Sequence, residues 1–164
     1  MKWLIILILY SPLALADVDD FARDHLKWND TATPGTISDY GVGFMMAGPI
    51  AYTAINTKDL GKTGIVTGAY ALNLGTNYLV KILIRRERPD KSDRLSHWSG
   101  HTSTSFVGAG VVCAQSKKLC PVALGLAGSI GLLRIGADKH WLSDVLVGAL
   151  VGMTTGKLIL SGRF

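Results

Sequence analysis

The sequence predicts an all-α fold, a bundle of about five helices that follows an N-terminal signal segment and is embedded in a membrane. Apolar residues gather in long uncharged stretches, and short turns that contain charged residues separate these stretches. No stretch alternates apolar and polar residues as a half-buried strand does. The composition is 48% hydrophobic with a mean hydropathy of +0.30, which is more apolar than that of a typical soluble domain.

The first 16 residues have the pattern of a secretory signal peptide. Lys2 precedes an apolar run over 3–10, and small residues at 14–16 form a cleavage site. We expect cleavage after Ala16, and the alternative is an uncleaved first membrane helix. In both cases residues 17–164 are expected to form one domain that begins outside the cytoplasm.

The polar segment 17–39 is expected to contain a short amphipathic helix, which Thr33-Pro34-Gly35 then breaks. The remaining helices are expected in the uncharged stretches 40–57, 63–80, 102–116 and 119–133, and in a last segment from Trp141 towards Leu160. Two polar residues inside the second stretch, Asn73 and Asn77, should face other helices, because hydrocarbon would penalise them.

Three cations on separate segments indicate a site for a phosphate group. Lys81 and Arg88 are seven residues apart and so lie on one face of a helix that Pro89 ends. Arg134 lies on another segment. A phosphate monoester needs about three such cations to offset its charge and to bind its oxygens.

Two histidines and a carboxylate accompany these cations. Ser99, Gly100 and His101 lie just before a predicted helix, so the backbone N–H groups of its first turn can bind phosphate, and glycine permits close approach. His140 and Asp144 are four residues apart at the start of the last helix, a spacing that lets the carboxylate accept a hydrogen bond from one imidazole nitrogen.

The three motifs resemble the signature of the type 2 phosphatidic acid phosphatase (PAP2) superfamily, and the chain is similar to a small bacterial member. The matching pieces are KILIRRERP at 81–89, WSGH at 98–101 and LRIGADKHWLSD at 133–144. Nine of the eleven signature identities are present at the family's internal spacings. Trp98 stands where the family has proline, and Leu133 stands where it has a serine that donates to phosphate.

The resemblance implies phosphoryl transfer through a phosphohistidine without a metal or other cofactor. His140 would attack phosphorus, Asp144 would orient it, and His101 would protonate the leaving oxygen. The family's phosphate-binding positions correspond here to Lys81, Arg88, Ser99, Gly100 and Arg134. We expect Leu133 to weaken phosphate binding by about 1.5 to 3 kcal/mol, because one hydroxyl donor is lost. Trp98 is expected to face lipid headgroups or substrate.

Other charged or reactive residues receive simpler interpretations. Arg85 and Arg86 are expected to form a solvated helix end or to contact lipid headgroups, and His25 and His97 to be structural or surface residues. Cys113 and Cys120 flank a turn and are expected to form a disulfide in a soluble periplasmic protein. In a membrane arrangement that turn is cytoplasmic and the pair should stay reduced.

Charge placement predicts the orientation in a bacterial envelope. The motifs fall at one end of the bundle, and the opposite end carries the lysines Lys58, Lys62, Lys117, Lys118 and Lys157. By the positive-inside rule the lysine end is cytoplasmic and the phosphate site faces the periplasm from the inner membrane. Charged turns also suit a soluble periplasmic bundle, because turns between buried helices are usually charged.

The sequence therefore predicts a phosphatase acting on a phosphate or diphosphate of a lipid, such as undecaprenyl diphosphate, phosphatidylglycerol phosphate, phosphatidic acid or lipid A. A soluble non-specific acid phosphatase, a lipid phosphotransferase and a non-catalytic headgroup-binding protein are the alternatives. The net charge of +5 and pI near 9.3 favour anionic partners. We find no nucleic-acid-binding signature and no spacing of metal ligands.

Overall fold

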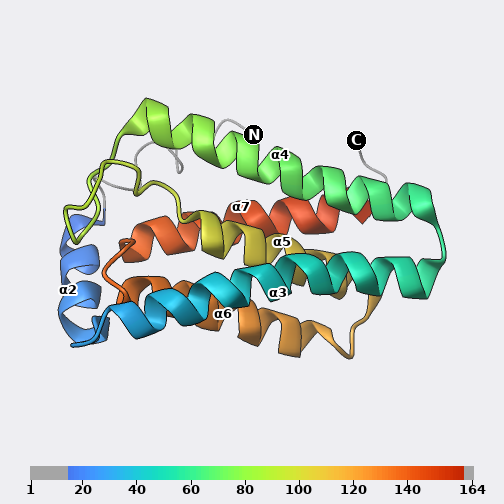
Figure 1. Cartoon of the computed structure of the whole chain (residues 1–164), viewed down its shortest axis with the longest axis horizontal. Coiled ribbons are helices and arrows are strands. Elements are labelled where there is room, and N and C mark those ends of the chain that lie inside the picture. Colours follow the sequence, from blue (N-terminus) through green and yellow to red (C-terminus); the bar gives the residue numbers. More distant parts are fainter. Residues whose placement is uncertain (1–14, 161–164) are drawn as a thin grey trace.

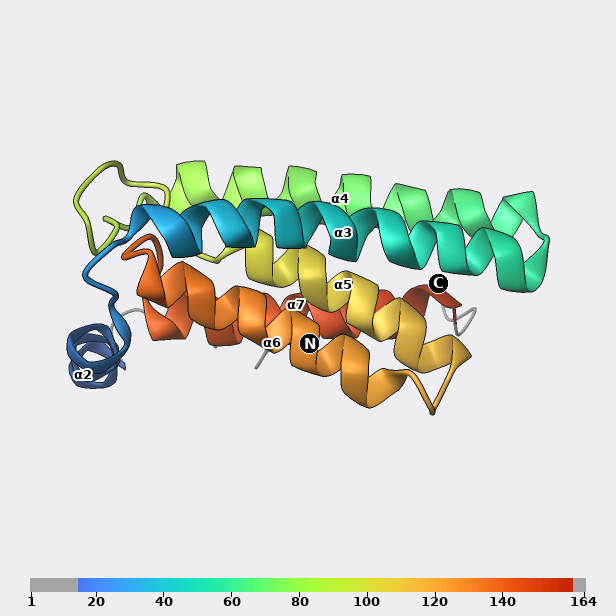
Figure 2. The same cartoon turned by 60° about the horizontal axis from the view of Figure 1, so that its bottom comes forward.

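The computed structural model describes residues 15–160, and within them the chain forms six helices and no strand. The helices are α2 (Ala16–Leu26), α3 (Ala32–Thr57), α4 (Leu60–Ile84), α5 (Gly100–Gln115), α6 (Cys120–Gly136) and α7 (Leu142–Leu160). Helices α3 to α7 run along a common axis, whereas α2 lies across one end of this bundle (Figure 1, Figure 2). The all-α prediction is confirmed. The predicted signal segment lies outside the described residues except at its last two positions.

Helix α3 begins earlier than the sequence predicts, and the Asp30 carboxylate just before it binds its first turn. The Asp30 carboxylate accepts hydrogen bonds from the backbone N–H groups of Ala32 at 3.0 Å and Thr33 at 3.4 Å. Pro34 lies in the first helical turn, where its missing N–H would have no helical partner in any case. The prediction that Thr33-Pro34-Gly35 interrupts the helical structure was therefore wrong, because the interruption lies between α2 and α3, at 27–31.

A proline inside α3 is compensated by a tyrosine from α4. Because Pro49 has no N–H, the carbonyl of Met45 one turn earlier lacks its helical donor. The Tyr70 hydroxyl donates to this carbonyl at 2.8 Å. Gly108 of α5 packs against the same point, where a Cβ would lie only 2.3 Å from the Met45 oxygen. The absence of a side chain at position 108 therefore permits the close contact of α3 and α5.

Helix α5 contacts α3, α4, α6 and α7, and its packing on α7 also depends on glycines. A Cβ on Gly152 would lie 2.1 Å from the carbonyl oxygen of Ser103, and one on Gly156 would lie 2.2 Å from that of Val107. The backbones of the two helices are therefore nearly in contact. This packing fixes the start of α5 and the start of α7 relative to each other.

Two asparagines of α4 face neighbouring segments: Asn73 faces another helix, as predicted, and Asn77 faces the loop before α5. Asn73 accepts a hydrogen bond from the Ser103 hydroxyl at 2.6 Å and donates to the Thr104 hydroxyl at 3.3 Å. Asn77 donates to the backbone carbonyl of Trp98 at 2.9 Å. These bonds join the middle of α4 to the start of α5 and to the loop before it. They satisfy amides that would otherwise be buried without partners.

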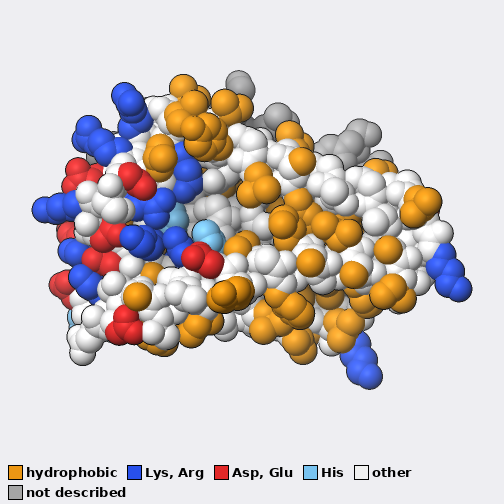
Figure 3. Space-filling model, viewed as in Figure 1, with side chains coloured by type: hydrophobic (Ala, Val, Ile, Leu, Met, Phe, Trp, Pro, Cys, Tyr) orange, Lys and Arg blue, Asp and Glu red, His pale blue; other side chains and the backbone are white. Residues whose placement is uncertain are grey.

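The surface divides into a charged end and an apolar body. Charged side chains gather at the end where α2 lies, and large apolar side chains cover the middle of the bundle (Figure 3). Exposed examples are Ile37, Tyr40, Phe44, Ile55, Leu72, Leu83 and Val122. The turns that carry Lys58, Lys62, Lys117 and Lys118 lie at the opposite end (Figure 1). Within the described residues, α7 is the one helix whose length and composition suit a membrane span.

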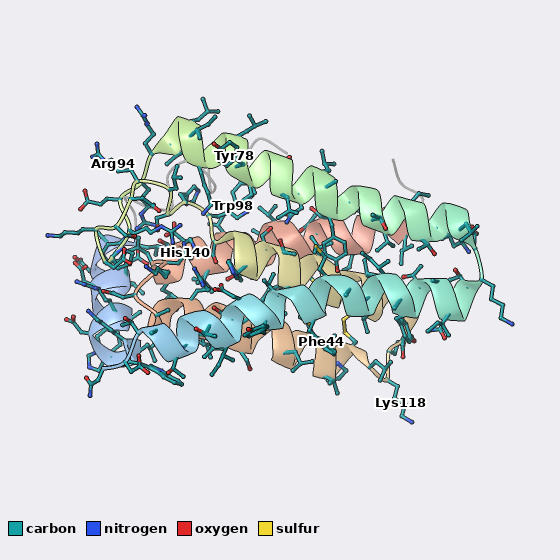
Figure 4. The ribbon with its side chains drawn as sticks, in the orientation of Figure 1. Phe44, Tyr78, Arg94, Trp98, Lys118 and His140 are labelled. Carbon is teal, nitrogen blue, oxygen red and sulfur yellow. A yellow bond between two sulfur atoms is a disulfide. The ribbon has the colours of Figure 1, made fainter. Side chains whose placement is uncertain are left out.

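A disulfide joins Cys113 to Cys120 across the turn between α5 and α6. Lys118 projects from the same turn into the surroundings (Figure 4). The structure therefore has the disulfide that we expected for a soluble periplasmic protein, and not the reduced pair that we expected for a cytoplasmic turn. The two cysteines lie far from the charged end and take no part in its chemistry.

Candidate active site

A cavity of about 400 Å³ opens at the charged end of the bundle. Its polar wall contains the side chains of Asp39, Lys81, Arg88, His101, Arg134 and His140. Val42, Met46 and Leu74 form an apolar wall between α3 and α4. Residues from four helices and two loops therefore meet in one space. The three predicted cations and both predicted histidines are among them.

Each cation of the cavity is held by a neighbouring oxygen. Lys81 donates from Nζ to the carbonyl oxygen of Leu95 at 2.6 Å, and Arg88 donates from Nε to Asp93 at 2.7 Å. The Lys81 side chain is buried, because α4 ends directly beneath the loop 85–99. These contacts fix the positions of the two cations on one side of the cavity.

Arg134 reaches the cavity from the last turn of α6. Its Nη1 donates to the Ser38 hydroxyl at 3.0 Å and to the Asp39 carboxylate at 3.2 Å. Its Nε is buried and has no hydrogen-bond partner among the described residues. Since a buried guanidinium N–H is normally paired, this donor is suited to an anionic ligand.

His140 lies in the loop 137–141, inside the charged end of the bundle (Figure 4). Its side chain is 2% exposed. Burial lowers the pKa of His140 to about 3, although the nearby Asp144 carboxylate acts in the opposite direction. The imidazole is therefore neutral near pH 7, and a neutral imidazole has the lone pair that nucleophilic attack requires.

The predicted hydrogen bond between His140 and Asp144 is absent from this structure. His140 Nδ1 lies 3.9 Å from the nearest Asp144 oxygen, which is beyond hydrogen-bond distance, and this buried nitrogen has no hydrogen-bond partner within residues 15–160. His140 precedes α7, which begins at Leu142, so the two residues do not share a helical face. Asp144 accepts instead from Ser96, and from the backbone N–H of Trp141 at 3.2 Å.

Arg86 and His97 also bind Asp144, and sequence reasoning missed both. Arg86 Nη1 donates to Asp144 at 2.7 Å, and His97 Nδ1 lies 3.0 Å from the same oxygen. Arg86 Nη2 donates to Asp19 of α2, also at 2.7 Å. The expectation that Arg86 is solvated or contacts headgroups was wrong, whereas Arg85 is exposed as expected. Neither the KxxxxxxRP spacing nor the SGH motif signals these contacts.

Helix α2 holds the loop that carries His140. Arg23 donates two hydrogen bonds to Asp138, at 2.7 and 2.9 Å, and Lys27 lies 2.9 Å from the same carboxylate. The hydrogen bond from Arg23 lowers the pKa of Asp138, so the carboxylate is charged near neutral pH. The loop 137–141 is thus bonded to α2 through Asp138 and to α7 through the backbone N–H of Trp141.

The Ser99-Gly100-His101 segment begins α5 as predicted. Gly100 and His101 border the cavity, and a Cβ on Gly100 would lie 2.9 Å from Oδ1 of Asn77. Ser99 is fully buried and outside the cavity wall, and its hydroxyl oxygen accepts from Thr102 as the helix cap. A role for Ser99 in binding phosphate therefore stays a prediction.

The two departures from the family signature lie away from the cavity. Trp98 is 2% exposed and does not line the cavity, so the expectation that its indole faces headgroups or substrate was wrong. Leu133 lines a separate pocket together with Leu26 and Trp28 near α2. Leu133 therefore packs beside the N-terminal helix. Its effect on phosphate binding stays untested, and Ser38 supplies a hydroxyl beside Arg134.

Asp39 is a further member of the site that the sequence did not reveal. Its Oδ1 lies 2.8 Å from His101 Nε2 and 3.2 Å from Arg134 Nη1. Asp39 comes from the second turn of α3, in a polar segment without any motif. No local sequence signal distinguishes it from the other aspartates of the N-terminal region, because its partners are 62 and 95 residues away along the chain.

Comparisons with known proteins agree with the motifs. A family model described as the PAP2 superfamily matches residues 62–164. Lipid A 1-phosphatase of Porphyromonas gingivalis is 38% identical over 77 residues, which make up 44% of this chain and 17% of that protein. The match thus covers only a small part of the length of this curated relative.

Two crystal structures have a similar fold. LpxE of Aquifex aeolicus superposes with a TM-score of 0.72 at 22% identity, covering 89% of this chain and 94% of that one. A transmembrane PAP2-type phosphatidylglycerolphosphate phosphatase of Bacillus subtilis superposes with a TM-score of 0.75 at 18% identity. In that case 98% of this chain and 92% of the other are covered. At these identities the likeness concerns the fold.

Proposed function

Because the chain belongs to the PAP2 superfamily, we propose that it is a metal-independent phosphatase of a lipid phosphate or diphosphate that acts through a phosphohistidine. The observation that carries the proposal is the composition of the cavity. Three cations and two histidines border one space, and an apolar wall continues from it between α3 and α4. A phosphate headgroup suits the cations, and a hydrocarbon chain suits the apolar wall.

In the first step His140 attacks phosphorus with Nε2, because Nδ1 faces Asp144. The N–P bond forms as the P–O bond to the leaving group breaks, and His101 gives its proton to the leaving oxygen. Lys81, Arg88 and Arg134 neutralise the oxygens of the transferring group. The buried Arg134 Nε, which has no hydrogen-bond partner in the described part of the chain, is available for one of these oxygens.

In the second step water attacks the phosphohistidine. The water gives a proton to His101, the N–P bond breaks, and inorganic phosphate leaves. Asp144 stabilises the positive charge that His140 carries as the phosphohistidine forms. The present separation of 3.9 Å between the two side chains must shorten for a direct hydrogen bond, and catalytic hydrogen bonds commonly tighten when substrate binds.

The proposed location is the inner membrane of a bacterial envelope, with the cavity at the periplasmic face. The exposed apolar side chains of the bundle body and the lysines at the far end support this arrangement. The relatives named above include a transmembrane phosphatase and a lipid A phosphatase. A lipid substrate that lies in the same membrane would present its phosphate at the charged end.

The proposal is tested by measuring phosphate release from a lipid phosphate in EDTA, with the full chain in detergent. We expect turnover that survives the chelator and is lost in His140→Ala, and we expect acid-labile phosphate to accumulate on His101→Ala. His25→Ala is the matched control, because His25 is an exposed histidine of α2 that contacts Phe21 and not the cavity. Loss of turnover in EDTA, or full activity of His140→Ala, would refute the mechanism.

The same assay separates the alternatives. Faster turnover of a small soluble ester than of any lipid phosphate would favour a non-specific acid phosphatase. Release that needs an added alcohol or lipid acceptor would indicate a phosphotransferase. Binding of inorganic phosphate without any turnover would indicate a non-catalytic headgroup-binding protein.

A further inference from the structure

The cavity contains a carboxylate where an anion is expected to bind. Asp39 is the one acidic side chain among the described residues that line it. Its Oδ1 contacts both His101 Nε2 and Arg134 Nη1, as given above. Asp39 lies outside residues 62–164, the part of the chain that the family model matches. It reaches the cavity from α3, which the matched part does not include.

Stability does not account for this carboxylate. The Asp39 side chain is 63% exposed, and ion pairs of such exposed groups contribute little to folding. Arg134 already has a buried partner in Ser38. A negative charge beside Arg134 also opposes the binding of any anion, so its presence needs a reason in the chemistry of the substrate.

The position of Asp39 relative to the reaction supplies this reason. On the proposed function, His101 protonates the leaving oxygen, and Asp39 contacts Nε2 of the same imidazole ring. The leaving group therefore lies within about the width of one imidazole ring of the Asp39 carboxylate. A neutral leaving group with a hydroxyl can donate a hydrogen bond to it, whereas a leaving group that carries a phosphate brings a second negative charge towards it.

We propose that Asp39 is a specificity-determining residue that selects phosphate monoesters of neutral alcohols or sugars and rejects diphosphates. This inference rests on the proposed function. In monoester hydrolysis the breaking P–O bond releases an alcohol that takes the proton of His101. In diphosphate hydrolysis the same bond releases a phosphate monoester anion, which the Asp39 carboxylate repels.

The test compares farnesyl phosphate with farnesyl diphosphate, which share one chain and differ in the charge of the leaving group. We expect the wild type to prefer the monophosphate, and Asp39→Asn to raise kcat/KM for the diphosphate by about tenfold in absolute terms. Asp90→Asn is the control, because Asp90 is a carboxylate at the same end of the molecule that pairs with Lys139 outside the cavity. Asp90→Asn should leave kcat/KM unchanged for both the monophosphate and the diphosphate.

An absolute rise in kcat/KM for the diphosphate distinguishes a specificity role of Asp39 from a role in supporting His101 as an acid. Weakening the acid alone would lower monophosphate turnover and leave the diphosphate value unchanged, because a phosphate is a better leaving group than an alcohol. That result, or an equal fall with both substrates, would overturn the inference. If the wild type turns over neither substrate, the proposed function fails first.

A binding measurement tests Asp39 without turnover. Methylenediphosphonate and methylphosphonate are the probes, and their affinities are read from the shift in melting temperature of the full chain in detergent. Asp39→Asn should raise the affinity for methylenediphosphonate about tenfold relative to the affinity for methylphosphonate. An unchanged ratio in a variant that melts like the wild type would overturn the inference.

Discussion

Arg86 donates a hydrogen bond to Asp144 across 2.7 Å, and the same guanidinium binds Asp19 of α2 at an equal distance. Asp19 in turn accepts the backbone N–H of Ser143 at 2.7 Å, in the first turn of α7. The guanidinium thus joins three segments that surround the candidate nucleophile. Asp144 and Asp19 are both almost fully buried, so Arg86 offsets two carboxylate charges inside the protein.

Replacing Arg86 with alanine should destabilise the protein by about 3 kcal/mol, because two buried carboxylates lose their partner. Phosphate release should fall as well, since Asp144 would lose the group that fixes its position. The melting temperature and kcat of the purified chain are the measurements. Arg85→Ala is the matched control, because Arg85 is the exposed neighbour, and it should melt like the wild type. Equal melting of the two variants would contradict the buried network.

Replacing Gly108 with alanine should separate α3 from α5. The new Cβ would lie 2.3 Å from the Met45 carbonyl oxygen and 2.8 Å from the Tyr70 hydroxyl, so these groups must move. We expect a loss of about 1–3 kcal/mol, read as a lower melting temperature. Gly68→Ala is the control, since no described residue comes within 4 Å of a Cβ there. That variant should keep or gain stability, because alanine is the better helix former.

Burial of His140 should make stability depend on pH. In the folded chain its pKa is about 3, against an ordinary value of 6.5, so between these values the unfolded chain binds a proton that the folded chain does not. The neutral folded form is fully favoured above 6.5, and stability should fall as the pH drops from there towards 3. His140→Asn should show a smaller drop in melting temperature over this range. Parallel curves for the two proteins would show that His140 is not buried as described.

The cysteine pair provides a test of orientation. Purified protein under air should contain no thiol that reacts with a maleimide, because Cys113 and Cys120 are close enough to bond. In the proposed orientation the turn between α5 and α6 faces the reducing cytoplasm. This orientation conflicts with the disulfide in the structure. Maleimide added to intact cells during lysis decides between the two, and labelling of both cysteines would support the orientation. A pair that is already oxidised at that moment would place the lysine end in the oxidising compartment and overturn the orientation.

The sequence predicted the members of the cavity better than it predicted their contacts. Lys81, Arg88 and Arg134 reach the cavity because they lie at or near connections between successive helices. In an up-and-down bundle every second connection lies at the same end. The hydrogen bond between His140 and Asp144, in contrast, was predicted only from their separation of four residues. That contact fails because α7 begins only after His140, at Leu142, so His140 does not lie on the helical face that carries Asp144.

By itself, the sequence determined the helical plan, the charged and apolar regions of the surface, and the family to which the motifs belong. Helical periodicity and motif spacing are local properties, and they remain visible in one chain without any structure. The tertiary structure alone decided that Asp39 joins His101, and that Arg86 binds both Asp19 and Asp144. These partners are 58 to 67 residues apart, and pairing at such distances depends on how helices pack, which no local pattern encodes.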